Sequence, residues 1–180
     1  MNTPEKYVYA FEEGDGSNKM LLGGKGANLC EMTQIGINVP PGFVITTAAC
    51  LYCLDNADHD LPAGVMDEIR EQMRALEEKT GKTFGGSENP LLISVRSGSA
   101  MSMPGMMDTI LNLGLNIDTL KGLIAHTGTE RFGWDAYRSF IQLFCKDAIG
   151  ETDEAFEAEY DDVKEKAVAK DNVALTARDL

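Results

Sequence analysis

The sequence predicts an α+β fold, because β-prone runs and helical patterns share the first 115 residues while helical patterns alone fill the rest. Apolar residues spaced three and four apart mark the helices. We therefore expect one unit over residues 1–115 and a helical unit over residues 116–180. Turn residues bound four runs rich in β-branched, aromatic and aliphatic side chains, at 7–11, 43–46, 91–96 and 109–113.

The charge balance and the length of the apolar runs exclude two classes of partner. The 180 residues carry a formal net charge of −13 and no run of basic side chains, which argues against a nucleic acid. No apolar run reaches the roughly 18 residues of a membrane helix, and residues 1–14 lack the form of a signal peptide. The chain has four cysteines but enough apolar residues to fold without disulfides, which indicates a cytoplasmic protein.

A glycine-rich turn at residues 23–26 follows the first strand and carries Lys25. Apolar residues at a spacing of three over 29–35 predict a helix after it, with Gly36 as its end. Free N–H groups and the positive end of a helix dipole favour an anion at such a turn. The glycine spacing is not that of a Walker A loop. Two interpretations remain, a phosphate-binding turn and a tight turn with a solvated lysine.

Two more helices are predicted between the second and third β-prone runs. Thr47 can cap the first, and Pro62 can begin a longer one that ends at Gly81. The first helix contains Cys50 and Cys53 as a C-x-x-C. No second cysteine or histidine pair follows at zinc spacing, so small core residues are favoured over a redox pair or half a zinc site.

The stretch from residue 91 to 112 organises the chain as a strand, a loop of Gly, Ser and Met, and a second strand. Between residues 89 and 117 the only charged side chains are Arg96 and Asp108. A lone arginine in an apolar strand needs an anion to face, since a buried unpaired charge is very costly. A guanidinium can bind two phosphate oxygens at once. The alternative is an ion pair between Arg96 and Asp108.

The loop at residues 97–108 has the composition of a flap that closes over a phosphate. Gly98 and Gly105 allow close approach of the backbone, and the serines and backbone N–H groups can donate hydrogen bonds. The alternative is that its methionines cover an edge of the core. These side chains supply adaptable apolar surface: Met101, Met103, Met106 and Met107.

Helices are predicted over the last third of the chain. Asp118 would cap a short helix, and Thr129 would begin a longer one with an apolar stripe. Arg138 lies off that stripe, where it can face solvent or a phosphate. Thr176 and Asp179 form a capping-box pattern at the start of a further helix, so we expect the chain to be a piece of a longer protein.

Several motifs taken together indicate one protein family far more specifically than any one of them alone. SVRSGSAMSMPGMMDTILNLG strongly resembles the nucleotide-binding domain of the pyruvate, phosphate dikinase family. Phosphoenolpyruvate synthases and glucan dikinases share the GGKG and VRS elements, whereas the MPGMMDTILN loop is particular to the dikinase branch. Four more segments resemble the same family in the same order: YAFEEG, LLGGKGANLCEMTQIGINVPPGF, ENPLLISVRSG and RFGWDAYRSFIQLF.

The resemblance implies the N-terminal part of an ATP-grasp fold, with a mixed or antiparallel sheet and flanking helices, plus a helical C-terminal segment. It implies a phosphotransferase that moves a phosphoryl group from ATP, through a carrier histidine, to pyruvate, or runs the reverse reaction from phosphoenolpyruvate. Lys25 and Arg96 match the family's catalytic cations. Together with the flap over residues 103–109, the ATP-binding set is Lys25, Arg96, Met103, Gly105, Met106, Asp108, Thr109 and Arg138.

The resemblance also places parts of the enzyme beyond residue 180. These are the ligands of Mg²⁺, the carrier-histidine domain and the pyruvate-binding barrel, so no metal ligand is assigned within the chain. Expected partners are ATP or AMP, phosphate, those domains, and further copies of the full-length enzyme in a homo-oligomer. The isolated chain is expected to be inactive. Alternatives are a fragment of a phosphoenolpyruvate synthase or glucan dikinase, and a stand-alone non-catalytic nucleotide-binding domain.

Overall fold

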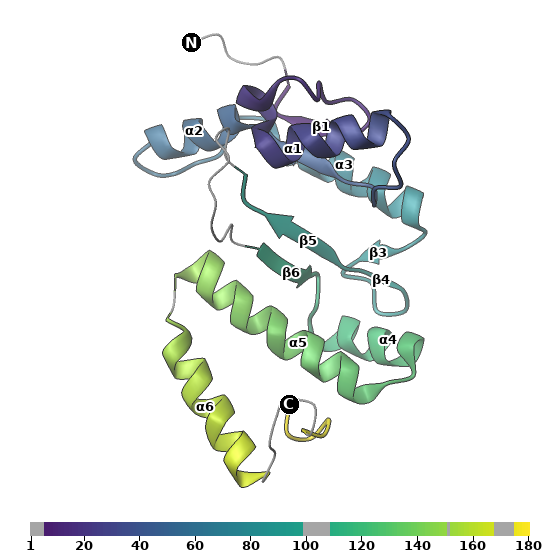
Figure 1. Cartoon of the computed structure of the whole chain (residues 1–180), viewed down its shortest axis with the longest axis vertical. Coiled ribbons are helices and arrows are strands. Elements are labelled where there is room, and N and C mark those ends of the chain that lie inside the picture. Colours follow the sequence, from purple (N-terminus) through teal and green to yellow (C-terminus); the bar gives the residue numbers. More distant parts are fainter. Residues whose placement is uncertain (1–5, 99–108, 151, 168–174) are drawn as a thin grey trace. The chain divides into compact units, whose positions relative to one another are not determined.

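The computed structural model describes residues 6–98, 109–150, 152–167 and 175–180. Contacts divide these residues into two compact units (Figure 1). Unit 1 holds residues 6–81 with 97 and 98, and unit 2 holds the rest. These two units differ from the two expected from the sequence, residues 1–115 and residues 116–180. That expected division stays a prediction. Every helix in the described ranges is too short or too polar to span a bilayer.

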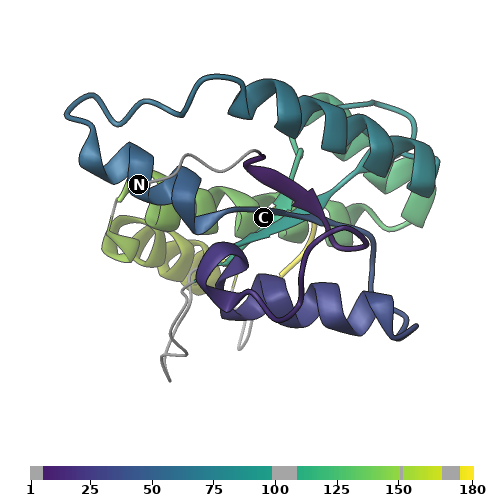
Figure 2. The same ribbon diagram turned by 90° about the horizontal axis from the view of Figure 1, so that it is seen from above.

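Unit 1 is built on a two-stranded antiparallel ladder, β1 (Val8–Ala10) with β2 (Phe43–Ile45). Helices α1 (Lys19–Gln34) and α3 (Val65–Thr80) flank this ladder on opposite sides (Figure 2). Successive strand side chains point to opposite faces. Two small apolar clusters therefore form, one around Tyr7, Val8, Ala49 and Val65 and the other around Leu22, Ala27 and Cys30.

The helix boundaries in unit 1 correct two expectations. Helix α2 (Thr47–Asp55) is capped by Thr46, one residue earlier than predicted, because Thr46 stays extended and its N–H donates to the carbonyl of Tyr7. Helix α3 begins at Val65 rather than at Pro62. Its predicted end is confirmed: Gly81 has φ 66°, and its N–H donates to the Glu77 carbonyl at 2.8 Å.

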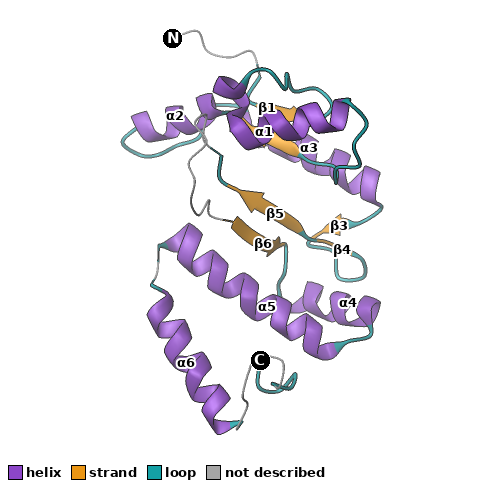
Figure 3. Ribbon diagram, in the orientation of Figure 1, coloured by secondary structure: helices purple, strands orange, loops and turns teal. Residues whose placement is uncertain are grey.

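The described residues of unit 2 include four short strands (Figure 3). Strand β3 (Thr83–Phe84) runs parallel to β4 (Pro90–Leu91), and β5 (Ile93–Arg96) pairs antiparallel with β6 (Thr109–Leu113). The register of the β5–β6 pair is irregular between Ile93 and Val95. With helices around small sheets, the predicted α+β class is confirmed.

Two helices of unit 2 pack against each other, α4 (Ile117–Thr127) and α5 (Glu130–Phe144). Asn116 and Thr119 form the capping box of α4, so the expected cap at Asp118 is wrong. Thr129 directly precedes α5, as predicted. Gly133 allows the close approach of the two helices, because a Cβ there would lie 2.4 Å from Ile124. Helix α5 continues into a π-helical turn, η1 (Cys145–Ile149), which is followed by α6 (Asp153–Lys166).

Candidate phosphate-binding site

The glycine turn of unit 1 interrupts helix α1. Gly23 has φ 69° and ψ 163°, a conformation that is essentially restricted to glycine. The helix is thus split into a single turn, residues 19–22, and a longer segment, residues 24–34. The predicted break before a helix N-terminus is confirmed at Gly23, but the rest of the predicted turn is wrong, because residues 24–26 are helical. A single helical turn also precedes the break, which the sequence did not predict.

Contacts on both sides hold the interruption in place. Asn18 caps the single turn, with its Oδ1 accepting a hydrogen bond from the N–H of Leu21 at 3.1 Å. Gly26 packs directly against β2, since a Cβ at this position would lie 2.8 Å from Cγ1 of Val44. The hydroxyl of Thr47 donates to two carbonyls of the single turn. The longer segment is therefore packed against β2, and the single turn before the break is held by α2.

Lys25 lies in the first turn of the longer segment and is half-buried. Its ammonium group forms no ion pair or side-chain hydrogen bond with any residue in the part of the chain that the structure describes. The first N–H groups of a helix have no intrahelical acceptors, and the dipole adds positive potential there. The turn thus presents an uncompensated cation and helix N-terminal donors in one place.

Arg96 ends β5 and is exposed to solvent, as are its neighbours Ser94 and Val95. The expectation that burial forces an anion onto Arg96 is wrong, because the charge is hydrated in this chain. The irregular register breaks the simple alternation of faces, so that Val95 is 43% exposed. Among the described residues Arg96 has no ion-pair partner. Its guanidinium is therefore accessible to a ligand.

The structure brings Arg96 and Thr109 together as cross-strand partners at the base of the loop. Thr109 opens β6 and is half-buried. The remaining flap residues, Met103, Gly105, Met106 and Asp108, lie outside the described residues. The flap and the alternative ion pair with Asp108 therefore stay predictions.

Arg138 is engaged by neighbours within unit 2. Its Nη2 lies 3.0 Å from Oδ1 of Asp135, and its Nη1 donates to Oε1 of Gln142 at 3.0 Å. The guanidinium carbon lies 4.5 Å from the ring centroid of Tyr160 on α6. Asp135 precedes Arg138 by three residues and Gln142 follows it by four, so the sequence alone indicates both as possible helical partners of Arg138. The contact with Tyr160 was not, because it joins two helices.

Arg138 also lines a cavity of about 150 Å³ within unit 2. The hydroxyl of Tyr160 is buried and has no hydrogen-bond partner among the described residues. Neither Lys25 nor Arg96 lines this cavity. Its other walls come from α5, α6 and the last two residues: Gln142, Phe156, Glu159, Tyr160, Val163, Asp179 and Leu180.

The described residues hold no cluster of three or more His, Cys, Asp or Glu side chains that could bind a metal ion. Cys50 is exposed and Cys53 half-buried on α2, so the expectation that both are core residues is wrong for Cys50.

The chain is similar to proteins of one family along nearly its whole length. Residues 19–65, which include the interrupted helix and Lys25, match the family model described as "Pyruvate phosphate dikinase, AMP/ATP-binding domain". The Entamoeba histolytica pyruvate, phosphate dikinase is 54% identical over 173 residues, which are 96% of this chain and 19% of that protein. The chain's homologues are pyruvate, phosphate dikinases.

Other dikinases match over the same extent. The Clostridium symbiosum pyruvate, phosphate dikinase is 48% identical over 97% of this chain and 20% of its own length. The chloroplastic dikinase 1 of Zea mays is 46% identical over 100% of this chain and 19% of its own. The chain thus spans about a fifth of the length of the curated dikinases it matches. The match to their AMP/ATP-binding domain supports the binding of a nucleotide.

Proposed function

We propose that this chain contributes phosphate-binding residues to the ATP site of a pyruvate, phosphate dikinase. The observation that carries the proposal is a coincidence of position. The segment that matches an AMP/ATP-binding domain is also the one whose helix is interrupted at Gly23 and presents Lys25 without a counter-ion among the described residues. The longer protein would transfer a phosphoryl group from ATP to a carrier histidine and then to pyruvate, or run the reverse.

Each proposed residue has a role that its chemistry fits. Phosphoryl transfer is catalysed mainly by positioning and by neutralising charge on the phosphate oxygens. Lys25 would supply a point charge at a helix N-terminus, and Arg96 would bind two oxygens through its planar fork. The loop over residues 103–109 would cover the phosphates and exclude water, with Thr109 at its base. The attacking imidazole would come from the carrier domain.

Arg138 is proposed to act in a less direct way. Its guanidinium already binds Asp135 and Gln142 and stacks on Tyr160. A phosphate oxygen reaching Arg138 would have to compete with the Asp135 carboxylate. We therefore propose Lys25 and Arg96 as the primary cations and Arg138 as a secondary member of the nucleotide-binding set.

Further parts of the proposal concern the longer protein. Mg²⁺ would neutralise the nucleotide phosphates when bound, with ligands supplied outside the described residues. Phosphate, the carrier-histidine domain, the pyruvate-binding barrel and a second copy of the full-length chain are the proposed partners. A cytoplasmic location is supported by four free cysteines, which are typical of a reducing compartment.

The first test is a two-dimensional NMR titration of the 180-residue chain with Mg-ATP. For an incomplete site we expect weak binding, with a dissociation constant on the order of 1 mM. Shift changes should be centred on residues 22–27. The Lys25→Met variant should lose them, whereas Lys19→Met, which removes an exposed charge from the same helix, should keep them.

A second measurement, in the full-length protein, separates a wrong assignment from a weak half-site. Lys25→Met should reduce ATP-dependent phosphorylation of the carrier histidine and spare the exchange of phosphoryl groups with pyruvate. Equal rates in Lys25→Met and wild-type protein would remove Lys25 from the ATP site. An equal loss in both half-reactions would indicate general misfolding and would also contradict the assignment.

A further inference from the structure

Two adjacent threonines cap the ends of two different helices. The side chain of Thr46, which is 1% exposed, accepts a hydrogen bond from the N–H of Ala49 and caps the start of α2. The hydroxyl of Thr47 acts on another helix. It donates to the carbonyl oxygen of Met20 at 2.5 Å and lies 3.2 Å from that of Leu21. Both acceptors belong to the single turn that precedes the interruption of α1.

These two carbonyls would be satisfied within the helix if α1 were continuous. In an α-helix the carbonyl of residue i accepts from the N–H of residue i+4, which here means Gly24 and Lys25. The ψ of 163° at Gly23, far from the helical value near −42°, turns the peptide group that carries the Gly24 N–H away from the helix axis. The Thr47 hydroxyl supplies a donor from outside the helix to the carbonyls at this break.

We propose that Thr47 is a positioning residue for the phosphate-binding turn. By donating to the Met20 and Leu21 carbonyls, it stabilises the interruption at Gly23. The N–H groups that open the longer segment are then kept out of intrahelical hydrogen bonds and available to an anion beside Lys25. This inference rests on the proposed phosphate-binding role of that turn and adds a residue that touches no ligand itself.

The packing of α1 does not depend on this hydroxyl. Gly26 lies against Val44, and Leu22 with Cys30 belongs to the apolar cluster on the same face. Thr47→Val keeps the volume and branching of the side chain and removes only the donor. The fold is thus expected to persist while the conformation of residues 22–26 changes.

The experiment compares three variants of the 180-residue chain by amide exchange in NMR. In Thr47→Val the Met20 and Leu21 carbonyls lose their donor, so the Gly24 and Lys25 N–H groups should bond to them. Exchange of these two amides should slow about five- to tenfold, which corresponds to the gain of one ordinary hydrogen bond. Thr47→Ser, which retains a hydroxyl, should restore the wild-type rates.

Thr33→Val is the matched control, because it removes a hydroxyl that donates to the Leu29 carbonyl at 2.8 Å in the same helix. It should leave the exchange of Gly24 and Lys25 unchanged. A Mg-ATP titration of the same samples should show weaker binding for Thr47→Val, by about five- to tenfold, and wild-type binding for Thr47→Ser and Thr33→Val.

The outcomes separate this inference from the proposed function. Wild-type exchange and affinity in Thr47→Val would overturn the role of Thr47, as would equal effects of Thr33→Val. If Thr47→Ser behaves like Thr47→Val, the hydroxyl is not the acting group and the inference also fails. If the wild-type chain and the full-length protein both show no contribution of this turn to ATP binding, the proposed function fails. The role of Thr47 toward a ligand fails with it, even where the exchange data support the hydroxyl's effect on the helix.

Discussion

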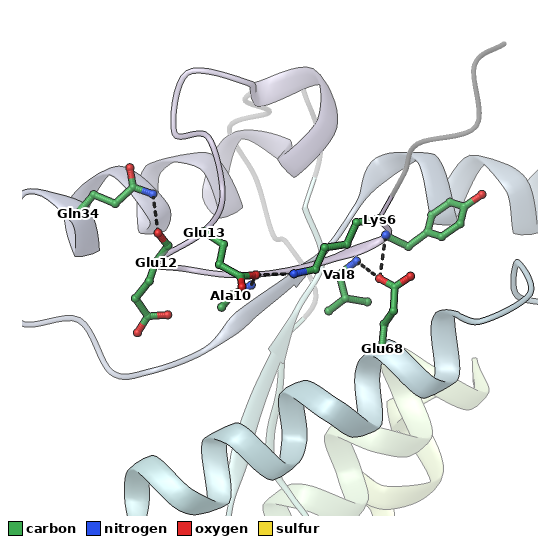
Figure 4. A network of polar contacts seen from close by, with 8 residues as sticks. Lys6, Val8, Ala10, Glu12, Glu13, Gln34 and Glu68 are labelled. Carbon is green, nitrogen blue, oxygen red and sulfur yellow. Dashed lines mark hydrogen bonds and ion pairs between the residues drawn. The ribbon is translucent and has the colours of Figure 1, made fainter.

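Glu68 on α3 binds the backbone of β1 through one carboxylate oxygen, which accepts hydrogen bonds from the N–H of Val8 at 2.8 Å and of Tyr7 at 2.9 Å (Figure 4). Val8 is fully buried, so its amide has little access to water. The N–H of Val8 points away from β2, because the carbonyl of the same peptide group, that of Tyr7, accepts a hydrogen bond from the N–H of Thr46. The carboxylate thus satisfies a donor on the outer edge of the ladder. Helix α3 is thereby tied to the ladder by a polar contact as well as by the apolar cluster.

The Glu68→Ala variant should lower the free energy of unfolding by about 2 kcal/mol, because it leaves two partly buried N–H groups without their charged acceptor. Thermal or urea unfolding of the 180-residue chain measures this change. Glu71→Ala, at an exposed position of the same helix, should change stability by less than about 0.5 kcal/mol. Similar losses in the two variants would contradict the role of Glu68.

Acid should weaken the segment that follows β1. The hydrogen bond from Lys79 holds the pKa of Glu12 below its ordinary value of 4.5, and the hydrogen bond from Lys6 does so for Glu13. A carboxylate with a lowered folded-state pKa stabilises the fold above its unfolded-state pKa, and this stabilisation is lost as the pH falls through the folded value. The unfolding temperature should therefore decline below about pH 4.5. The free energy of unfolding should fall by under about 1 kcal/mol for each exposed pair.

The matched variant for this pH dependence is Lys6→Met with Lys79→Met, which removes both donors. Its stability should fall less steeply between neutral and acid pH than that of the wild-type chain. A parallel pH profile in the two proteins would assign the acid sensitivity to other carboxylates.

Gly26→Ala should separate α1 from β2. The new Cβ would lie 2.8 and 2.9 Å from the two methyl carbons of Val44, so helix or strand must move. We expect a loss of about 1–3 kcal/mol from overpacking, although alanine is intrinsically the better helix residue. In a Val44→Ala background the same change should cost much less. Additive effects in this double-mutant cycle would mean that the two residues do not interact.

Arg96→Lys should weaken nucleotide binding without affecting the fold. Arg96 is exposed and has no ion pair in the described part of the chain, so the unfolding temperature should stay within about 1 °C. In the full-length protein, replacing a bidentate donor with a point charge should reduce ATP-dependent histidine phosphorylation by about tenfold. Unchanged phosphorylation would remove Arg96 from the site, and a lowered unfolding temperature would give it a structural role.

The sequence predicts the elements of this fold better than their first residues. Strand β6 has the predicted bounds, and α3 ends at the predicted glycine. Helix starts are shifted because neighbouring residues can all act as caps. Thr46 rather than Thr47 caps α2 because its N–H is held by Tyr7, 39 positions earlier in the chain. Local sequence does not contain that contact.

The parts of the candidate site that depend on local backbone conformation could be predicted from the sequence. The glycine turn and Lys25 belong to this class, since both follow from residues within one turn of each other. The exposure of Arg96 was not predictable, because the contacts that decide burial of β5 come from segments distant in sequence, such as its partner strand β6. The stacking of Arg138 on Tyr160 also joins distant segments.

The single turn at residues 19–22 has a consequence for the order of folding. One turn of helix carries the full entropic cost of nucleation with almost no propagation to offset it, so it is not stable alone. Its Met20 and Leu21 carbonyls find the Thr47 donor only after β2 and the start of α2 have reached α1. This turn should therefore be among the last parts of unit 1 to form during refolding and the first to open. The longer segment after Gly23 can form earlier.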